Sequence, residues 1–315
     1  MKTISIADLS EYFNEITRKP NIFHDGLEAF YSITGNMKDI YEKSSIDYDA
    51  YYSLKRVSIM DNLELVKEFY KEINFDVNVD DLVADGTIDF IEQDSNICFL
   101  KGLSNYTNSG FNQVTVWETN NLLDGIVLVH ELSHKRDISR TYTKEMFTEG
   151  LAFAEERMYV DFLEKKGYKD VKKVWNNIMN VIVYDMYKIF FANIKIYLLF
   201  KNIGSIDRES YKYYYEDDSD YDEIIDTFTN ENNLDNCCSY SFGYAVSLLI
   251  YDKFINGELS SKDMNDLHNM MSENIGVVLK KIGLDFLSSK GREEMYKAAK
   301  KYYIKDKKEE LVIKH

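Results

Sequence analysis

The residues best suited to chemistry in this chain lie at positions 126–134, which read IVLVHELSH. This segment contains the pattern His-Glu-x-x-His, formed by His130, Glu131 and His134. On an α-helix, residues four apart lie on one face, so the two imidazoles can share one metal ion. Glu131 is offset by roughly 100° of helical arc, where it can contact a water molecule without binding the metal. The pattern predicts a zinc hydrolase site in which Glu131 accepts a proton.

Histidine is rare in this chain, which makes the pattern informative. Only five histidines occur among 315 residues. A chance His-Glu-x-x-His anywhere in such a sequence has a probability of roughly 1 in 100 or below. The alternative is a helix that carries two histidines by accident. Apolar residues at positions 126, 127 and 129 lead into the pattern, which favours a buried helix that carries a site.

A zinc hydrolase needs a third protein ligand and an open fourth position. The next helical pattern, residues 145–156 (EMFTEGLAFAEE), carries Glu149 and Glu156 seven positions apart and so nearly eclipsed. Glu149 lies near the start of this predicted helix, where the helix dipole favours a carboxylate. Small and apolar residues follow it and permit close helix packing. We expect Glu149 to be the third ligand, with Glu156 as the next candidate and Glu155 pointing elsewhere.

These two segments resemble the M3 family of zinc metallopeptidases, the thimet oligopeptidase and oligoendopeptidase F group of gluzincins. Residues 122–137 (LLDGIVLVHELSHKRD) are similar to the family's zinc helix with its aspartate-containing lead-in. Residues 147–156 (FTEGLAFAEE) are similar to the segment in which the first of two glutamates, here Glu149, binds zinc. The resemblance implies a multi-helical gluzincin catalytic domain, one Zn²⁺ per chain and an oligopeptide substrate.

The resemblance continues in residues 239–257 and 282–285, which are similar to the family's C-terminal helices. Tyrosines of those helices face the substrate, and Tyr240 and Tyr244 are the matching residues here. A phenol hydroxyl in that position can stabilise the oxyanion of amide hydrolysis. Core packing is the competing interpretation, because the chain has 25 tyrosines. In total the resemblance spans roughly residues 45–300.

The chain also departs from the family pattern. Ser133 stands where the family usually has Gly, and Asp137 stands where it has a further His. The connection from His134 to Glu149 is several residues shorter, no histidine shortly precedes Tyr240, and the chain is about half the usual length. These departures support two alternatives to an oligopeptidase. One is a peptide-binding or regulatory module with structural or vestigial zinc, and the other is a protease specific for one folded protein.

The remaining sequence predicts a mainly α fold with a small β-sheet beside the zinc helix. Proline occurs once and glycine 14 times, and long amphipathic patterns dominate. Residues 96–100 and 113–117 predict short strands on either side of a loop at 102–110 that is rich in Ser, Asn and Gly. An edge strand there could align an extended peptide, or the hairpin could simply pack against the helix.

We expect an N-terminal helical region at residues 1–90 and a zinc-binding catalytic region at 91–315, or one continuous domain. Residues 181–200 are apolar enough to suggest a membrane span, but Asp185, Lys188 and Lys195 interrupt them and favour a buried helix. Asp218, Asp220 and Asp222 alternate like the start of a calcium loop but lack its Gly and final Glu, which favours a solvated loop.

Composition excludes several partners. The net charge is −16 and the sequence shows no clustered basic face, so a nucleic-acid role is not expected. Three cysteines, two of them adjacent, are too few for a disulfide framework. The N-terminus lacks the apolar core of a signal peptide. We expect a cytoplasmic protein that binds neither nucleic acid nor membranes, and the sequence does not indicate its oligomeric state.

Overall fold

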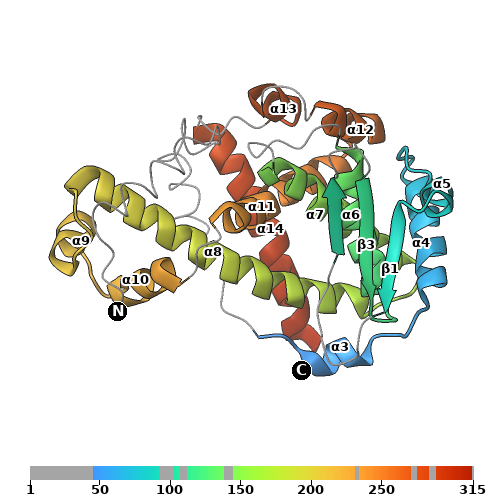
Figure 1. Ribbon diagram of the computed structural model, residues 1–315, viewed down its shortest axis with the longest axis horizontal. Coiled ribbons are helices and arrows are strands. Elements are labelled where there is room, and N and C mark those ends of the chain that lie inside the picture. Colours follow the sequence, from blue (N-terminus) through green and yellow to red (C-terminus); the bar gives the residue numbers. More distant parts are fainter. Residues whose placement is uncertain are drawn as a thin grey trace.

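A computed structural model describes residues 45–92, 102–106, 112–137, 145–230, 234–270, 275–283 and 289–313. These residues form a mainly α-helical fold with a small sheet on one side, as the sequence predicts (Figure 1). The elements up to residue 136 are α3 (Tyr48–Ser53), α4 (Ile59–Glu72), α5 (Val79–Ala84), β1 (Ile88–Glu92), β2 (Gly102–Tyr106), β3 (Asn112–Glu118) and α6 (Leu123–Arg136). The later helices are α7 (Glu145–Lys165), α8 (Val171–Ile203), α9 (Arg208–Tyr215), α10 (Tyr221–Asn230), α11 (Leu234–Ile255), α12 (Ser261–Asn269), α13 (Ile275–Lys281) and α14 (Ser289–Ile313).

The sheet has the strand order β1-β3-β2, with β3 parallel to β1 and antiparallel to β2. The strand expected at 113–117 is confirmed within β3. The loop expected at 102–110 is wrong for its first part, because residues 102–106 form β2. Backbone pairing with β3 overrides the weak strand propensity of Gly, Ser and Asn there. The strand expected at 96–100 lies outside the described residues.

Helix α6 is buried on all sides. Every residue from Leu123 to His134 is buried, as in a helix that passes through a core. Its start is fixed by the Asp124 carboxylate, which accepts hydrogen bonds from the backbone N–H groups of Thr119 (3.0 Å) and Asn120 (2.9 Å). These bonds hold the turn that follows β3, so the sheet and α6 have a fixed relative orientation.

Two glycines let the central helices approach closely. A Cβ atom at Gly125 of α6 would lie 2.7 Å from the Tyr159 hydroxyl of α7. A Cβ atom at Gly150 of α7 would lie 3.1 Å from Cγ1 of Val246 on α11. The close packing expected from the small residues after Glu149 is therefore confirmed. Helix α7 lies between α6 and α11, and side chains from all three can meet in one place.

Helix α8 is the longest element, with 33 residues, or about 50 Å at 1.5 Å per residue. It runs across the molecule, and α9 and α10 lie at its far end (Figure 1). Among the described residues, no single helix is both long and apolar enough to cross a membrane, and α8 passes that test only when joined to α9 across a 92° bend.

The acidic segment next to α9 is held by basic side chains. Asp220 accepts a hydrogen bond from Lys195 at 2.7 Å, Asp218 lies 3.2 Å from Arg208, and Asp222 also pairs with Arg208. All three aspartates thus have cationic partners from the protein itself. This arrangement agrees with the interpretation of the run as a surface segment and not as a calcium loop.

Candidate metal centre

His130, His134 and Glu149 converge between α6 and α7. The Nε2 atoms of the two histidines lie 3.0 Å apart. Oε2 of Glu149 lies 3.4 Å from Nε2 of His130, and its Oε1 lies 3.3 Å from Nε2 of His134. Within the described ranges, these residues are the group of three His, Cys, Asp or Glu side chains that could hold a metal ion.

The spacing of these atoms fits a small tetrahedral ion. Ligand atoms that lie 2.0–2.1 Å from a tetrahedral zinc ion are about 3.3 Å from one another. The two Nε2 atoms are 3.0 Å apart, and each has one of the two Glu149 oxygens at 3.3 or 3.4 Å, close to that value. In addition, Oε2 of Glu149 is buried and has no hydrogen-bond partner among the described residues. Two imidazoles and one carboxylate form a donor set typical of catalytic zinc.

The other ring nitrogen of His130 is held by Glu156. Nδ1 of His130 lies 2.5 Å from Oε1 of Glu156, and the Trp175 indole N–H donates to Oε2 at 2.7 Å. A carboxylate only accepts hydrogen bonds, so Nδ1 donates to Glu156, and Nε2 is the nitrogen that faces His134 and Glu149. Glu149 and Glu156, one above the other on α7, therefore contact opposite nitrogens of the same imidazole. Glu156 orients a ligand instead of binding at the centre.

The side of the centre next to His134 contains a chain of buried ionic contacts. Nδ1 of His134 lies 3.8 Å from Oδ2 of Asp137. His268 of α12 lies between two carboxylates, with Nδ1 at 2.7 Å from Asp137 and Nε2 at 2.9 Å from Glu155. Arg136 donates to the same Glu155 at 2.5 Å. Glu155 thus points away from the three ligands, as expected, and Asp137 and His268 form an outer contact to His134.

The ligand atoms perturb one another's ionisation. Burial alone would lower the pKa of the His130 imidazole, but the Glu149 and Glu156 carboxylates raise it well above its usual value. Burial alone would raise the pKa of the Glu149 carboxyl, but His134 and His130 hold it well below its usual range. The carboxylate therefore stays ionised at neutral pH and is available as a metal ligand.

Glu131 is buried on α6 beside the ligands, and Gly102 of β2 lies directly against it. A Cβ atom at Gly102 would lie 2.5 Å from Oε1 of Glu131 and 2.6 Å from Cγ1 of Val127. Any side chain at position 102 would push the Glu131 carboxylate out of place. Strand β2, which the sequence interpretation placed in a loop, therefore helps to define the position of the candidate base.

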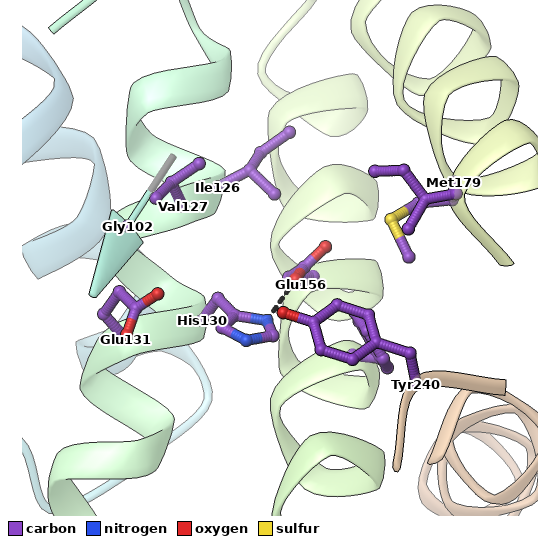
Figure 2. Close-up of a pocket in the computed structure, with 10 residues that line it drawn as sticks. Gly102, Ile126, Val127, His130, Glu131, Glu156, Met179 and Tyr240 are labelled. Atoms are coloured by element: carbon purple, nitrogen blue, oxygen red, sulfur yellow. Dashed lines mark hydrogen bonds and ion pairs between the residues drawn. The ribbon is translucent and has the colours of Figure 1, made fainter. Parts of the chain in front are cut away.

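A cavity of about 270 Å³ opens beside these residues and is lined in part by His130, Glu131 and Tyr240. Figure 2 shows Tyr240 with its hydroxyl directed toward the His130 imidazole. Its ring packs against Phe153, with centroids 5.5 Å apart. Tyr244 is 2% exposed, also packs against Phe153, and does not line this cavity. The structure brings Tyr240 near the candidate ligands and places Tyr244 in the core.

Sequence reasoning did not find the residues that come from distant elements. Trp175 and Met179 belong to α8 and His268 belongs to α12, and no local pattern links them to the His-Glu-x-x-His segment. Asp137 stood out only because it replaces a histidine of the family pattern. A carboxylate three residues after His134, at the end of the same helix, was the one signal that could have indicated an outer contact.

Comparison with known proteins gives one structural similarity. No family model matches the chain, and no curated protein matches it. The fold is similar to a solved structure described as "putative peptidase from Chlamydophila abortus", with a TM-score of 0.52 and 16% sequence identity. The match covers 94% of this chain and 55% of that one, so this chain spans about half the length of its neighbour. At this level of identity the similarity concerns the fold.

Proposed function

We propose that the protein is a zinc-dependent endopeptidase of the M3 type that hydrolyses peptide bonds in oligopeptides. One observation carries the proposal: two imidazole nitrogens 3.0 Å apart, each 3.3–3.4 Å from an oxygen of Glu149, lie beside a buried glutamate on the wall of a cavity. The description of the structural neighbour as a peptidase supports the same class of reaction. The oligopeptide substrate follows from the resemblance to the M3 family.

His130, His134 and Glu149 would hold the zinc ion. When bound, zinc polarises a carbonyl oxygen and lowers the pKa of water. Glu131 accepts a proton from the attacking water and passes it to the leaving amine. Tyr240 donates a hydrogen bond to the oxygen on which negative charge develops. Glu156 and Trp175 keep His130 in the required tautomer.

The test uses purified protein, a quenched peptide library and three samples: wild type, wild type with chelator, and Glu131→Gln. The proposal expects cleavage only in the first sample and a restored rate when zinc is added back. Glu131→Gln should bind zinc normally yet lose a factor of about 10²–10⁴ in rate, because an amide cannot accept the proton. Cleavage by Glu131→Gln at the wild-type rate would exclude Glu131 as the base.

The same samples, with peptide binding measured beside cleavage, separate the alternatives. A peptide-binding or regulatory module would bind library peptides and zinc but release no products in any sample. A protease specific for one folded protein would leave the library intact. Among the described residues, three side chains could bind the ion, as in catalytic zinc sites, whereas structural zinc sites have four protein ligands.

A further inference from the structure

The cavity beside His130 and Glu131 has walls that are mostly apolar. Ile126 and Val127 come from α6, Phe153 from α7, and Met179 and Ile182 from α8. Figure 2 shows Met179 across the cavity from Ile126 and Val127. All of these side chains except Ile182 are buried, and Ile182 is half-buried. Helix α8 therefore closes the cavity on the side opposite the candidate base.

The Glu156 carboxylate in the wall is already engaged by the protein. Glu156 accepts hydrogen bonds with both oxygens, from His130 and from Trp175. Both oxygens of Glu156 therefore already have hydrogen-bond donors from the protein and do not favour a basic ligand. Glu131 lies at the end of the cavity where the reaction would take place. The remaining surface favours an occupant that is apolar and loses little hydration on entry.

The volume of the cavity matches one side chain. Sites for small-molecule ligands typically measure about 300–1,000 Å³, and a dry cavity of roughly 150 Å³ holds one benzene molecule. At about 270 Å³, this cavity is too small for a whole drug-sized ligand but large enough for an aromatic or long aliphatic side chain. An extended peptide would place only one of its residues there.

We propose that this cavity is a specificity pocket that takes one large apolar side chain of the substrate, from the residue on one side of the scissile bond. The inference rests on the proposed function, because it assigns the cavity to the same peptide. The bound side chain would belong to a residue next to the scissile bond, because His130 and Glu131 themselves line the cavity. Met179 and Ile182 are then the residues that determine specificity, and neither takes part in the chemistry.

The first experiment maps cleavage sites in a peptide library by mass spectrometry. Wild type should favour Phe, Leu or Met over Ala or Gly at one flanking position by at least about tenfold, since hydrophobic pockets discriminate by about 10–200-fold. Ile182→Asp should reduce that preference by about tenfold, and Met179→Ala should shift it toward larger side chains. Ile189→Asp is the matched control, because Ile189 is a half-buried residue of the same helix that does not line the cavity.

The second experiment measures binding without turnover. Glu131→Gln protein is titrated with two labelled peptides that differ only by one Phe or Ala in a Gly and Ser background. The Phe peptide should bind about tenfold more tightly or better, and this advantage should disappear in Glu131→Gln/Ile182→Asp but persist in Glu131→Gln/Ile189→Asp. If the tighter binding of the Phe peptide is lost in Glu131→Gln/Ile182→Asp and kept in Glu131→Gln/Ile189→Asp, the pocket is supported even if no peptide is cleaved.

The two experiments distinguish the pocket from the proposed function. Cleavage with no apolar preference, or with a preference unchanged in both Met179→Ala and Ile182→Asp, would overturn the pocket and leave the peptidase proposal standing. A preference for Lys or Arg at the flanking position would also overturn it. Absence of cleavage together with equal binding of the two peptides would overturn both.

Discussion

Helix α8 carries a buried charged cluster near each end. Near its start, Trp175 contacts the metal centre through Glu156. Near its other end, Lys195 donates hydrogen bonds to the Tyr211 hydroxyl and to Asp220, both at 2.7 Å. About 30 Å of helix separates positions 175 and 195. Both clusters combine basic side chains with carboxylates, yet they differ in how completely the protein satisfies their hydrogen bonds and charges.

The Lys195 cluster is closed. Its single cation faces a single carboxylate, the Tyr211 hydroxyl donates to Asp220 at 2.8 Å, and aromatic rings surround the ammonium group with centroids at 4.7–5.3 Å. At the metal centre, two imidazole nitrogens and a buried carboxylate oxygen face one another instead, and Oε2 of Glu149 has no hydrogen-bond partner among the described residues. A closed cluster supports the fold, whereas convergent nitrogen and carboxylate groups are suited to hold a cation.

The largest expected effect is the loss of metal when a ligand is removed. Glu149→Ala should lower zinc affinity by more than about 100-fold, beyond the range seen for outer contacts. Glu155→Ala is the control, because Glu155 is buried six residues further along α7 and pairs with Arg136 and His268 instead. Elemental analysis and competitive metal titration measure the difference. Equal zinc affinity in the two variants would remove Glu149 from the ligand set.

One tyrosine from each cluster can be changed to phenylalanine to compare its effect on catalysis with its effect on stability. Tyr240→Phe should lower kcat by about 10²–10³ with little change in KM or zinc content, since the hydroxyl acts on charge that forms only near the transition state. Tyr211→Phe should leave kcat unchanged and lower the melting temperature, because its hydroxyl is enclosed by Lys195 and Asp220. Tyr244→Phe serves as a core control. If Tyr240→Phe has the kcat of wild type, the Tyr240 hydroxyl takes no part in the reaction and the residue has a structural role.

Outer contacts to the two ligand imidazoles should differ in strength. Glu156→Gln should weaken zinc binding by about 10–100-fold, because Glu156 lies 2.5 Å from Nδ1 of His130. Asp137→Asn should lower zinc affinity less, because Asp137 lies 3.8 Å from Nδ1 of His134. Zinc titration of both variants against the same chelator measures the order. A larger loss in Asp137→Asn would mean that the chain through His268 controls the centre.

The smallest effect on the site is expected from Lys195. Lys195→Met should lower the free energy of unfolding by about 1–3 kcal/mol, the usual cost of an unsatisfied buried partner. Its zinc affinity should equal that of wild type. Thermal unfolding with and without chelator should show the same shift in both states. A variant that also loses zinc would show that the clusters at the two ends of α8 are coupled.

The sequence predicted the local half of the site. His130, His134 and Glu149 lie on two successive helices, and helical periodicity alone places Glu149 and Glu156 on one face. It ranked Glu149 ahead of Glu156 as a ligand but did not predict that the two glutamates contact opposite nitrogens of His130. That difference arises because Trp175 of α8 takes one oxygen of Glu156, and a contact between helices is not encoded in the spacing of either.

The fold was predicted in class but not in every element. Long amphipathic patterns indicate helices reliably, and the buried strand β3 has regular Val residues at 114 and 116. Strand β2 was missed because Gly, Ser and Asn are typical of loops, and only its pairing with β3 makes it a strand. The same Gly102 that weakens the strand signal is required by its contact with Glu131. The division at residues 90 and 91 stays a prediction.

The contact between Trp175 and Glu156 places a fluorescent side chain next to the candidate metal centre. Trp117 and Trp175 are the two tryptophans of the chain, and Trp175 is 1% exposed with its indole N–H on the carboxylate that holds His130. A cation at Nε2 of His130 would add positive charge near that carboxylate and so change the electric field at the indole. In a Trp117→Phe variant, tryptophan emission therefore comes from this one position. Occupancy of the centre can then be followed in real time with no substrate.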